Sequence, residues 1–177
     1  YAMEIYLPYI HVYQNAEFGT ELPTVFETNG DVDTYSGEFQ YIHGWERVRV
    51  VGGLRQTHRD QSEVEDQSGD VMNRTFDFDS TSGYAYSYWQ ANEAIDITAG
   101  VSADWVEGRA VDTNELNPKF GLSWQLGPAS RIRLGAFRTI QPDSFSRQDI
   151  QPRLDPTQVV GFNQVFSGAQ GETEWRY

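Results

Sequence analysis

Apolar and polar residues alternate along most of the chain between Tyr35 and Ile140. Alternation with a period of two is the pattern of a β-strand whose two faces meet different surroundings. The clearest segment has its apolar positions at Ile95, Ile97, Ala99, Val101, Ala103 and Trp105. Further segments of this kind lie at 1–13, 35–45, 48–55, 76–88, 120–126 and 131–138. The sequence therefore predicts antiparallel strands that each have one apolar and one polar face.

The connections between these segments alternate between short and long. Short connections lie near Glu46, at 91–93 and at 127–130, and long polar ones at 14–32, 59–71, 107–117 and 141–171. Successive connections of an up-and-down barrel lie on opposite rims, and outer-membrane barrels have short turns on one rim and long loops on the other. Connections in a β-sandwich have no physical reason to alternate in length. The pattern favours a single antiparallel up-and-down transmembrane β-barrel region over residues 1–177, with about seven to eight strands.

A barrel must also close, because every unpaired backbone group at a sheet edge in lipid costs several kcal/mol. The segment 172–177 looks like the opening of another strand rather than a full span. We therefore expect the chain to be part of a larger barrel, completed by further strands or domains. The alternative is that Tyr177, with Trp175 in phase, is the aromatic end of a complete outer-membrane protein.

The alternation divides the candidate functional residues into two sets. The polar set is expected to line a hydrated lumen and consists of Glu38, Arg47, Arg49, Arg55, Asp96, Asp104, Arg131 and Arg133. The apolar set is expected to meet lipid or its interface and consists of Tyr41, Trp45, Tyr88, Ile97, Val101, Trp105, Leu122, Trp124 and Leu134. The same alternation also suits the solvent-facing and core residues of a soluble sandwich, so that architecture stays open here.

Composition narrows the function classes. Lys and Arg number 13 against 26 for Asp and Glu, and the resulting net charge of -13 argues against nucleic-acid binding. The chain has no cysteine, which excludes disulfides and thiolate metal sites. His11, His43 and His58 lack metal-ligand spacing, and an acidic run from Asp60 to Asp70 is best explained as a solvated loop. We expect no metal, no cofactor and no enzymatic activity.

Motifs in the last third of the chain resemble a known family. They are the run Asn117-Pro118-Lys119-Phe120-Gly121-Leu122, a turn with Pro128, the strand 131–138 followed by Pro142, and Leu154-Asp155-Pro156-Thr157. Together they resemble the barrel of TonB-dependent receptors. The segments 156–164 and 174–177 are similar to barrels at the end of tetratricopeptide-repeat outer-membrane proteins. Nothing in the chain resembles the plug domain or the TonB box of the receptors.

The resemblance implies a protein of the bacterial outer membrane, with the lipid bilayer as its surroundings and solute transport or uptake as its function. An alternative is a passive export porin, or a membrane anchor for a periplasmic repeat scaffold with periplasmic partners. A further alternative is a soluble β-sandwich binding module.

Overall fold

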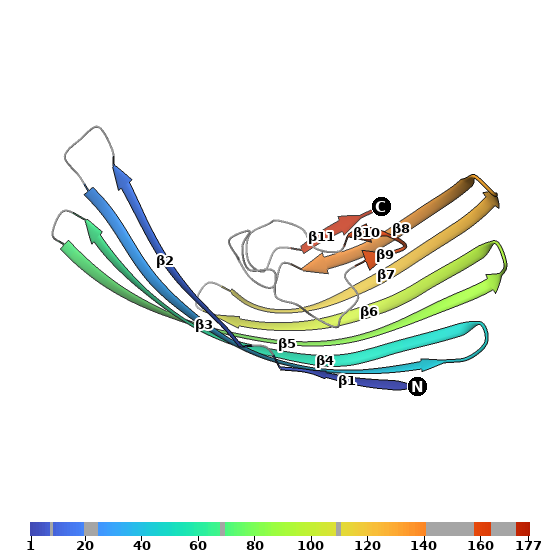
Figure 1. Ribbon diagram of the computed structural model, residues 1–177, viewed down its shortest axis with the longest axis horizontal. Coiled ribbons are helices and arrows are strands. Elements are labelled where there is room, and N and C mark those ends of the chain that lie inside the picture. The colour runs from blue at the N-terminus through green and yellow to red at the C-terminus, as the bar shows by residue number, and fades with distance from the viewer. Residues whose placement is uncertain (8, 20–24, 68–69, 109–110, 141–157, 164–172) are drawn as a thin grey trace.

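The computed structural model describes residues 1–7, 9–19, 25–67, 70–108, 111–140, 158–163 and 173–177, and its regular structure there is entirely β (Figure 1). The strands are β1 (Ala2–Tyr6), β2 (Tyr9–Gly19), β3 (Val25–Gly44), β4 (Val48–Gln67), β5 (Asp70–Asn92), β6 (Ile95–Gly108), β7 (Val111–Gly127), β8 (Ser130–Ile140), β9 (Gln158–Val159), β10 (Phe162–Asn163) and β11 (Thr173–Arg176). None of the described residues forms a helix that is long and apolar enough to cross a membrane.

Nine strands form one antiparallel sheet in the order β1-β3-β4-β5-β6-β7-β8-β11, and β2 also pairs with β3. Because β1 and β2 pair with successive parts of β3, they share one edge position. From β3 to β8, each strand pairs with its neighbour in sequence, which is the up-and-down arrangement expected. Among the described strands, β11 pairs with neither β1 nor β2, so this sheet is open. An open sheet is what part of a larger barrel would show.

Tight turns join β3 to β4, β5 to β6 and β7 to β8, and all three lie at the same end of the sheet (Figure 1). In the first, the Trp45 amide donates to the Val48 carbonyl at 2.7 Å. In the second, the Ala94 amide donates to Asn92 Oδ1 at 2.8 Å. The prediction that short connections gather on one rim is therefore confirmed.

The expectation of long loops at the opposite rim is wrong for three segments. β2 and β3 take up most of 14–32, β4 and β5 most of 59–71, and β6 and β7 most of 107–117. The strands β3, β4 and β5 contain 20, 20 and 23 residues, whereas about 9 to 11 cross a bilayer. A strand that extends beyond the bilayer meets water on both faces. Its apolar alternation then stops, although its backbone pairing continues. Of the fourth predicted loop, 141–171, all but 158–163 lies outside the described residues.

The two faces of the sheet differ in burial and polarity. The β9–β10 hairpin lies on one face of the sheet, where Val159 and Val160 contact the position of Gly121. We call this face the inner face and the opposite one the outer face. Buried polar residues share this face: Thr34, Glu38, Gln40, Thr57, Arg59, Ser80, Thr98, Ser102, Asp104, Asn117 and Lys119. The outer face instead carries exposed large apolar residues: Met3, Ile5, Phe39, Tyr41, Leu54, Trp89, Trp105, Leu116, Phe120, Trp124 and Leu134.

The inner face also buries apolar residues such as Val51, Phe78, Val106 and Phe137. The distribution still differs from that in a water-soluble sheet, which exposes polar residues and does not present a continuous face of large apolar ones. The outer face of β6 has an uninterrupted apolar run from Ile95 to Trp105, and that of β7 has one from Leu116 to Leu126. The other sheet in the described residues is the two-stranded hairpin, which lies on the opposite face. Among the described strands, the outer residues therefore have no second sheet to pack against, which argues against the sandwich alternative.

A charge placed in the middle of the apolar run should destabilise the protein in lipid. We expect Val101→Arg to lower the free energy of unfolding by about 2–4 kcal/mol, the cost of a cation near the bilayer midplane on a barrel's lipid face. Asp112→Arg is the matched control, because Asp112 shares the outer face but lies beyond the run on β7. Urea titration in lipid vesicles measures the free energy of unfolding of both variants and of the wild type. Equal effects of the two variants would contradict a lipid-facing run.

Candidate functional site

The inner face is held together by hydrogen bonds between polar side chains of different strands. Tyr84 Oη on β5 donates to Glu38 Oε1 on β3 at 2.9 Å, and Gln40 Nε2 donates to the same hydroxyl at 2.9 Å. All three residues are buried, with at most 6% of their surface exposed. Buried polar groups are stable only when they are bonded in this way, so the network satisfies the polar groups of the inner face, where Tyr84 also packs against Val51 and Tyr86.

A second network lies between β6 and β7. Asp104 Oδ2 accepts from Asn117 Nδ2 at 2.7 Å and from Ser102 Oγ at 3.0 Å. Within the described part of the chain, Asn117 Oδ1 is buried and lacks a hydrogen-bond donor. On the same face, Lys119 Nζ donates to the Arg138 carbonyl at 3.2 Å. Three charged or amide side chains are thus fixed in the wall of the inner face.

Tyrosines of β5 form a row along the inner face. The ring centroids of Tyr84 and Tyr86 lie 6.1 Å apart, and those of Tyr86 and Tyr88 lie 6.3 Å apart. The Arg49 guanidinium sits 4.4 Å from the centre of the Tyr88 ring, a cation–π contact. Gly100 leaves room for Tyr86, since a Cβ there would lie 2.5 Å from that ring.

Tyr88 corrects one sequence expectation. The sequence predicts that it meets lipid or its interface, but its cross-strand partners are Arg49 and Thr98, which place it on the inner face. The error arose because the apolar face of β5 was assigned to its aromatic residues. Tyrosine carries a polar tip that suits a hydrated or hydrogen-bonded wall, while the outward positions of β5 include the small residues Gly83 and Ala85.

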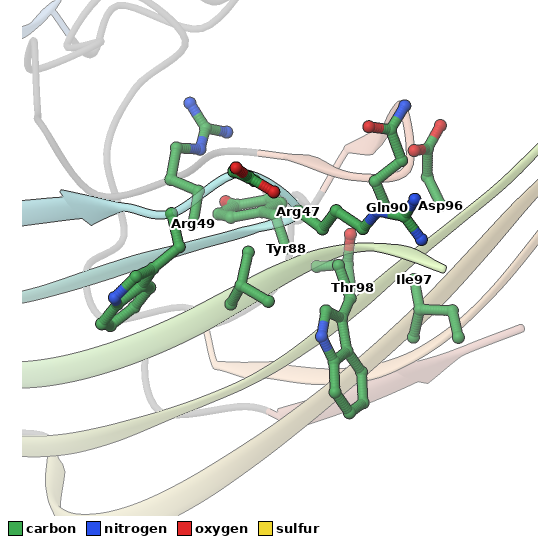
Figure 2. A pocket seen from close by; sticks show the side chains of 11 residues that line it. Arg47, Arg49, Tyr88, Gln90, Asp96, Ile97 and Thr98 are labelled. Atoms are coloured by element: carbon green, nitrogen blue, oxygen red, sulfur yellow. The ribbon is translucent and has the colours of Figure 1, made fainter. Parts of the chain in front are cut away.

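A cavity of about 300 Å³ lies beside the tight turns β3–β4 and β5–β6. Figure 2 shows that Arg47, Arg49, Gln90 and Asp96 point to one side of the sheet there, whereas Ile97 points to the other. The register agrees, because Gln90 pairs with Asp96, and Asp96 pairs with Ser123 on the inner face. The inner rim at the tight turns is therefore polar and carries more than one cation.

The remaining residues of the predicted lumen set also lie on the inner face. Arg131 and Arg133 pair with Gln125 and Ser123, and half-buried Arg55 pairs with Glu38. Arg131 Nε donates to Gln125 Oε1 at 2.8 Å. In the described parts of the chain, no ion pair involves the exposed arginines of the rim, which are Arg47, Arg49, Arg131 and Arg133.

Apart from Tyr88, the predicted lipid set lies on the outer face. By register or contact this set comprises Tyr41, Trp45, Ile97, Val101, Trp105, Leu122, Trp124 and Leu134. Trp45 belongs to it because its ring meets the His43 ring at 4.2 Å between centroids. Their exposure ranges from half-buried Leu122 to Trp45, which is 61% exposed.

Charged residues follow the apolar run on the outer face of the long strands. Beyond Leu54 on β4, His58 Nδ1 lies 2.9 Å from Asp79 Oδ1 on β5, and His58 Nε2 lies 3.3 Å from Asp60 Oδ1. The hydrogen bond to Asp79 raises the pKa of His58, burial opposes this rise, and the charges of Asp79 and Asp60 reinforce it. This charged group therefore lies on the outer face of β4 beyond its last large apolar residue before the group, Leu54.

Sequence reasoning missed several parts of the inner wall. It did not assign Tyr84, Gln40, Asn117 or Lys119 to the lumen set, because their roles depend on partners in other strands. Only the register supplies those partners, and no local motif announces them. In the described residues, no group of three or more His, Asp or Glu side chains could hold a metal ion.

Comparison with known proteins gives one match. The model of the family described as "TonB dependent receptor-like, beta-barrel" matches residues 6–169. The agreement thus extends over nearly the whole chain, and not only over the last third. No curated protein and no solved structure matches the chain.

His58 should titrate above an ordinary histidine. We expect Asp79→Asn to lower its pKa in the protein held in detergent micelles, followed by the NMR shift of the imidazole Cε1 proton, with His58→Gln identifying the signal. Because the folded state favours the charged ring, this contact stabilises the fold at low pH. The contribution is lost as the pH rises through the folded-state pKa. A titration unmoved by Asp79→Asn would refute the assignment.

Proposed function

The chain belongs to the TonB-dependent receptor-like β-barrel family, and on that premise we propose that it forms wall strands of an outer-membrane barrel that carries a solute through its lumen. The tight turns would face the periplasm and the extended ends of the long strands the exterior, as in other outer-membrane barrels. The family is one of receptor barrels, which gives no support to a catalytic role.

The inverted arrangement of side chains is the observation that carries this proposal. Buried polar networks on the inner face and exposed aromatic and aliphatic residues on the outer face suit a sheet with lipid outside and a polar interior. A receptor or pore needs such an interior, whereas a structural anchor needs only the outer face. The arrangement therefore supports passage of a polar solute.

Charge on the inner face supports a selective passage. The chain as a whole carries a net charge of -13, yet four exposed arginines occupy the rim beside the tight turns. Asp96 lies among them as a carboxylate of the same wall. Charged side chains that line a lumen select solutes by their sign, and the arginine-rich rim favours anionic groups at that end.

A second role has separate support in the sequence. The segments 156–164 and 174–177 resemble barrels that end tetratricopeptide-repeat proteins, which supports an export pore or an anchor for a periplasmic scaffold. Helical repeats in the same full-length protein would favour this role, and a plug domain would favour uptake. Reading the flanking coding sequence separates the two.

Reversing a rim charge tests the passage directly. In the full-length protein reconstituted in a planar bilayer under a salt gradient, we expect Arg49→Glu to shift the reversal potential toward cation preference. Arg49→Lys, which keeps the charge, should leave it near the wild-type value. If both variants and the wild type share one reversal potential, Arg49 does not line the conducting path.

A further inference from the structure

The β9–β10 hairpin is seated against a pair of glycines in the inner wall. Gly121 on β7 and Gly135 on β8 are direct cross-strand partners. A Cβ at Gly121 would lie 2.6 Å from Val160 Cγ1 and 2.9 Å from Val159 Cγ1, and one at Gly135 would lie 2.9 Å from Phe162 Cδ2. Two neighbouring positions without side chains thus let the hairpin approach the sheet backbone.

The hairpin is fitted to this seat. Val159 has 0% of its surface exposed, and its strand partner is Phe162. The turn between the strands has Val160 at φ 45° and Gly161 at φ 88°. A β-branched residue rarely adopts a positive φ, and such a conformation persists where its surroundings fix it. The contacts of Val160 with the wall at Gly121 and Gly135 provide that fixation.

The hairpin contacts β7 at the middle of that strand's apolar run. On the outer face of β7 the apolar run extends from Leu116 to Leu126, and Gly121 lies at its midpoint on the opposite face. The hairpin therefore lies inside the curved sheet, level with the middle of the lipid-facing run of β7 (Figure 1). Beside it, between Phe162 and β11, a cavity of about 440 Å³ remains open and is bordered by Glu174 and Arg176.

We propose that residues 158–163 form a fixed constriction inside the lumen, which sets the largest solute that can pass the middle of the membrane. The proposal rests on the proposed function, because a constriction matters only to a barrel that admits solute. Val159, Val160 and Phe162 narrow the passage on the side of β7 and β8, and the adjacent cavity is the free part of it. The side chain of Arg133 meets Gly161 at the tip of the hairpin and adds a cation to the narrowed path.

Disulfide formation tests where the hairpin lies without requiring transport. The chain has no cysteine, and a Cβ at Gly135 would lie 3.7 Å from Val160 Cγ2. We expect Gly135→Cys with Val160→Cys to cross-link on oxidation in the full-length protein in membranes. Trypsin and mass spectrometry would then find peptides 134–138 and 154–176 joined. The control pair, Leu134→Cys with Val160→Cys, differs by one residue and lies on opposite faces of the sheet, so it should not cross-link.

Displacing the hairpin tests its role as a constriction. Gly121→Val places a branched side chain in the seat, while valine itself suits a strand. We expect this variant to admit larger polyethylene glycols into the pore and to raise its conductance. Gly44→Val is the control, because a Cβ at Gly44 meets no atom within 4 Å. Heat-modifiable gel migration confirms that both variants fold.

The outcomes separate the two proposals. If the first cysteine pair fails to cross-link, or the control pair cross-links equally, the hairpin is not seated in the lumen and this inference is wrong, whatever the protein transports. If the hairpin cross-links but Gly121→Val leaves the size limit unchanged, it is not the constriction. If the hairpin cross-links but neither the wild type nor any variant conducts or admits a polyethylene glycol, the proposed function fails. The constriction role then fails with it.

Discussion

Backbone pairing between neighbouring strands is the constraint on which the rest of this structure depends. Hydrocarbon offers no partner to a backbone N–H or C=O group, so a chain that crosses it as strands must pair them all along a continuous ladder. From β3 to β8 that ladder runs between sequence neighbours with few interruptions. Once it is fixed, every second side chain is committed to one face. The polarity of each face then follows from what lies against it.

The inner face shows how a polar wall is made rigid. Buried hydroxyl, amide, carboxylate and cationic side chains lie on it beside apolar residues such as Val51, Val106 and Phe137. Networks such as Tyr84 with Glu38 and Gln40 satisfy these groups across strands, so the wall keeps its shape while it remains polar. Glycines in the wall leave space that other groups occupy. Rings fill the space at Gly100, whereas the paired Gly121 and Gly135 receive a segment from outside the sheet.

Sequence reasoning succeeded where one local rule acts alone. The alternation in β4 and β6 assigned their faces, and turn residues located the short connections on one rim. It failed where two rules compete. In β5 the aromatic character of Tyr88 predicts a lipid contact, although tyrosine also suits a polar wall. Charged segments such as 59–67 predict loops, although they pair as strands. The seating of residues 158–163 depends on glycines in distant strands, which no local pattern reveals. Closure of the barrel likewise depends on partners that alternation does not specify.

The central claim is that alternate residues of these strands face lipid. Nitroxide labels placed singly at each position between Ile95 and Trp105 of β6, in the full-length protein in lipid vesicles, measure this by their collisions with dissolved oxygen, which concentrates in hydrocarbon. The account predicts high oxygen collision rates at the odd-numbered positions and low rates at the even-numbered ones, with a period of two along the strand. Rates that do not alternate, or that peak at the even-numbered positions, would contradict it.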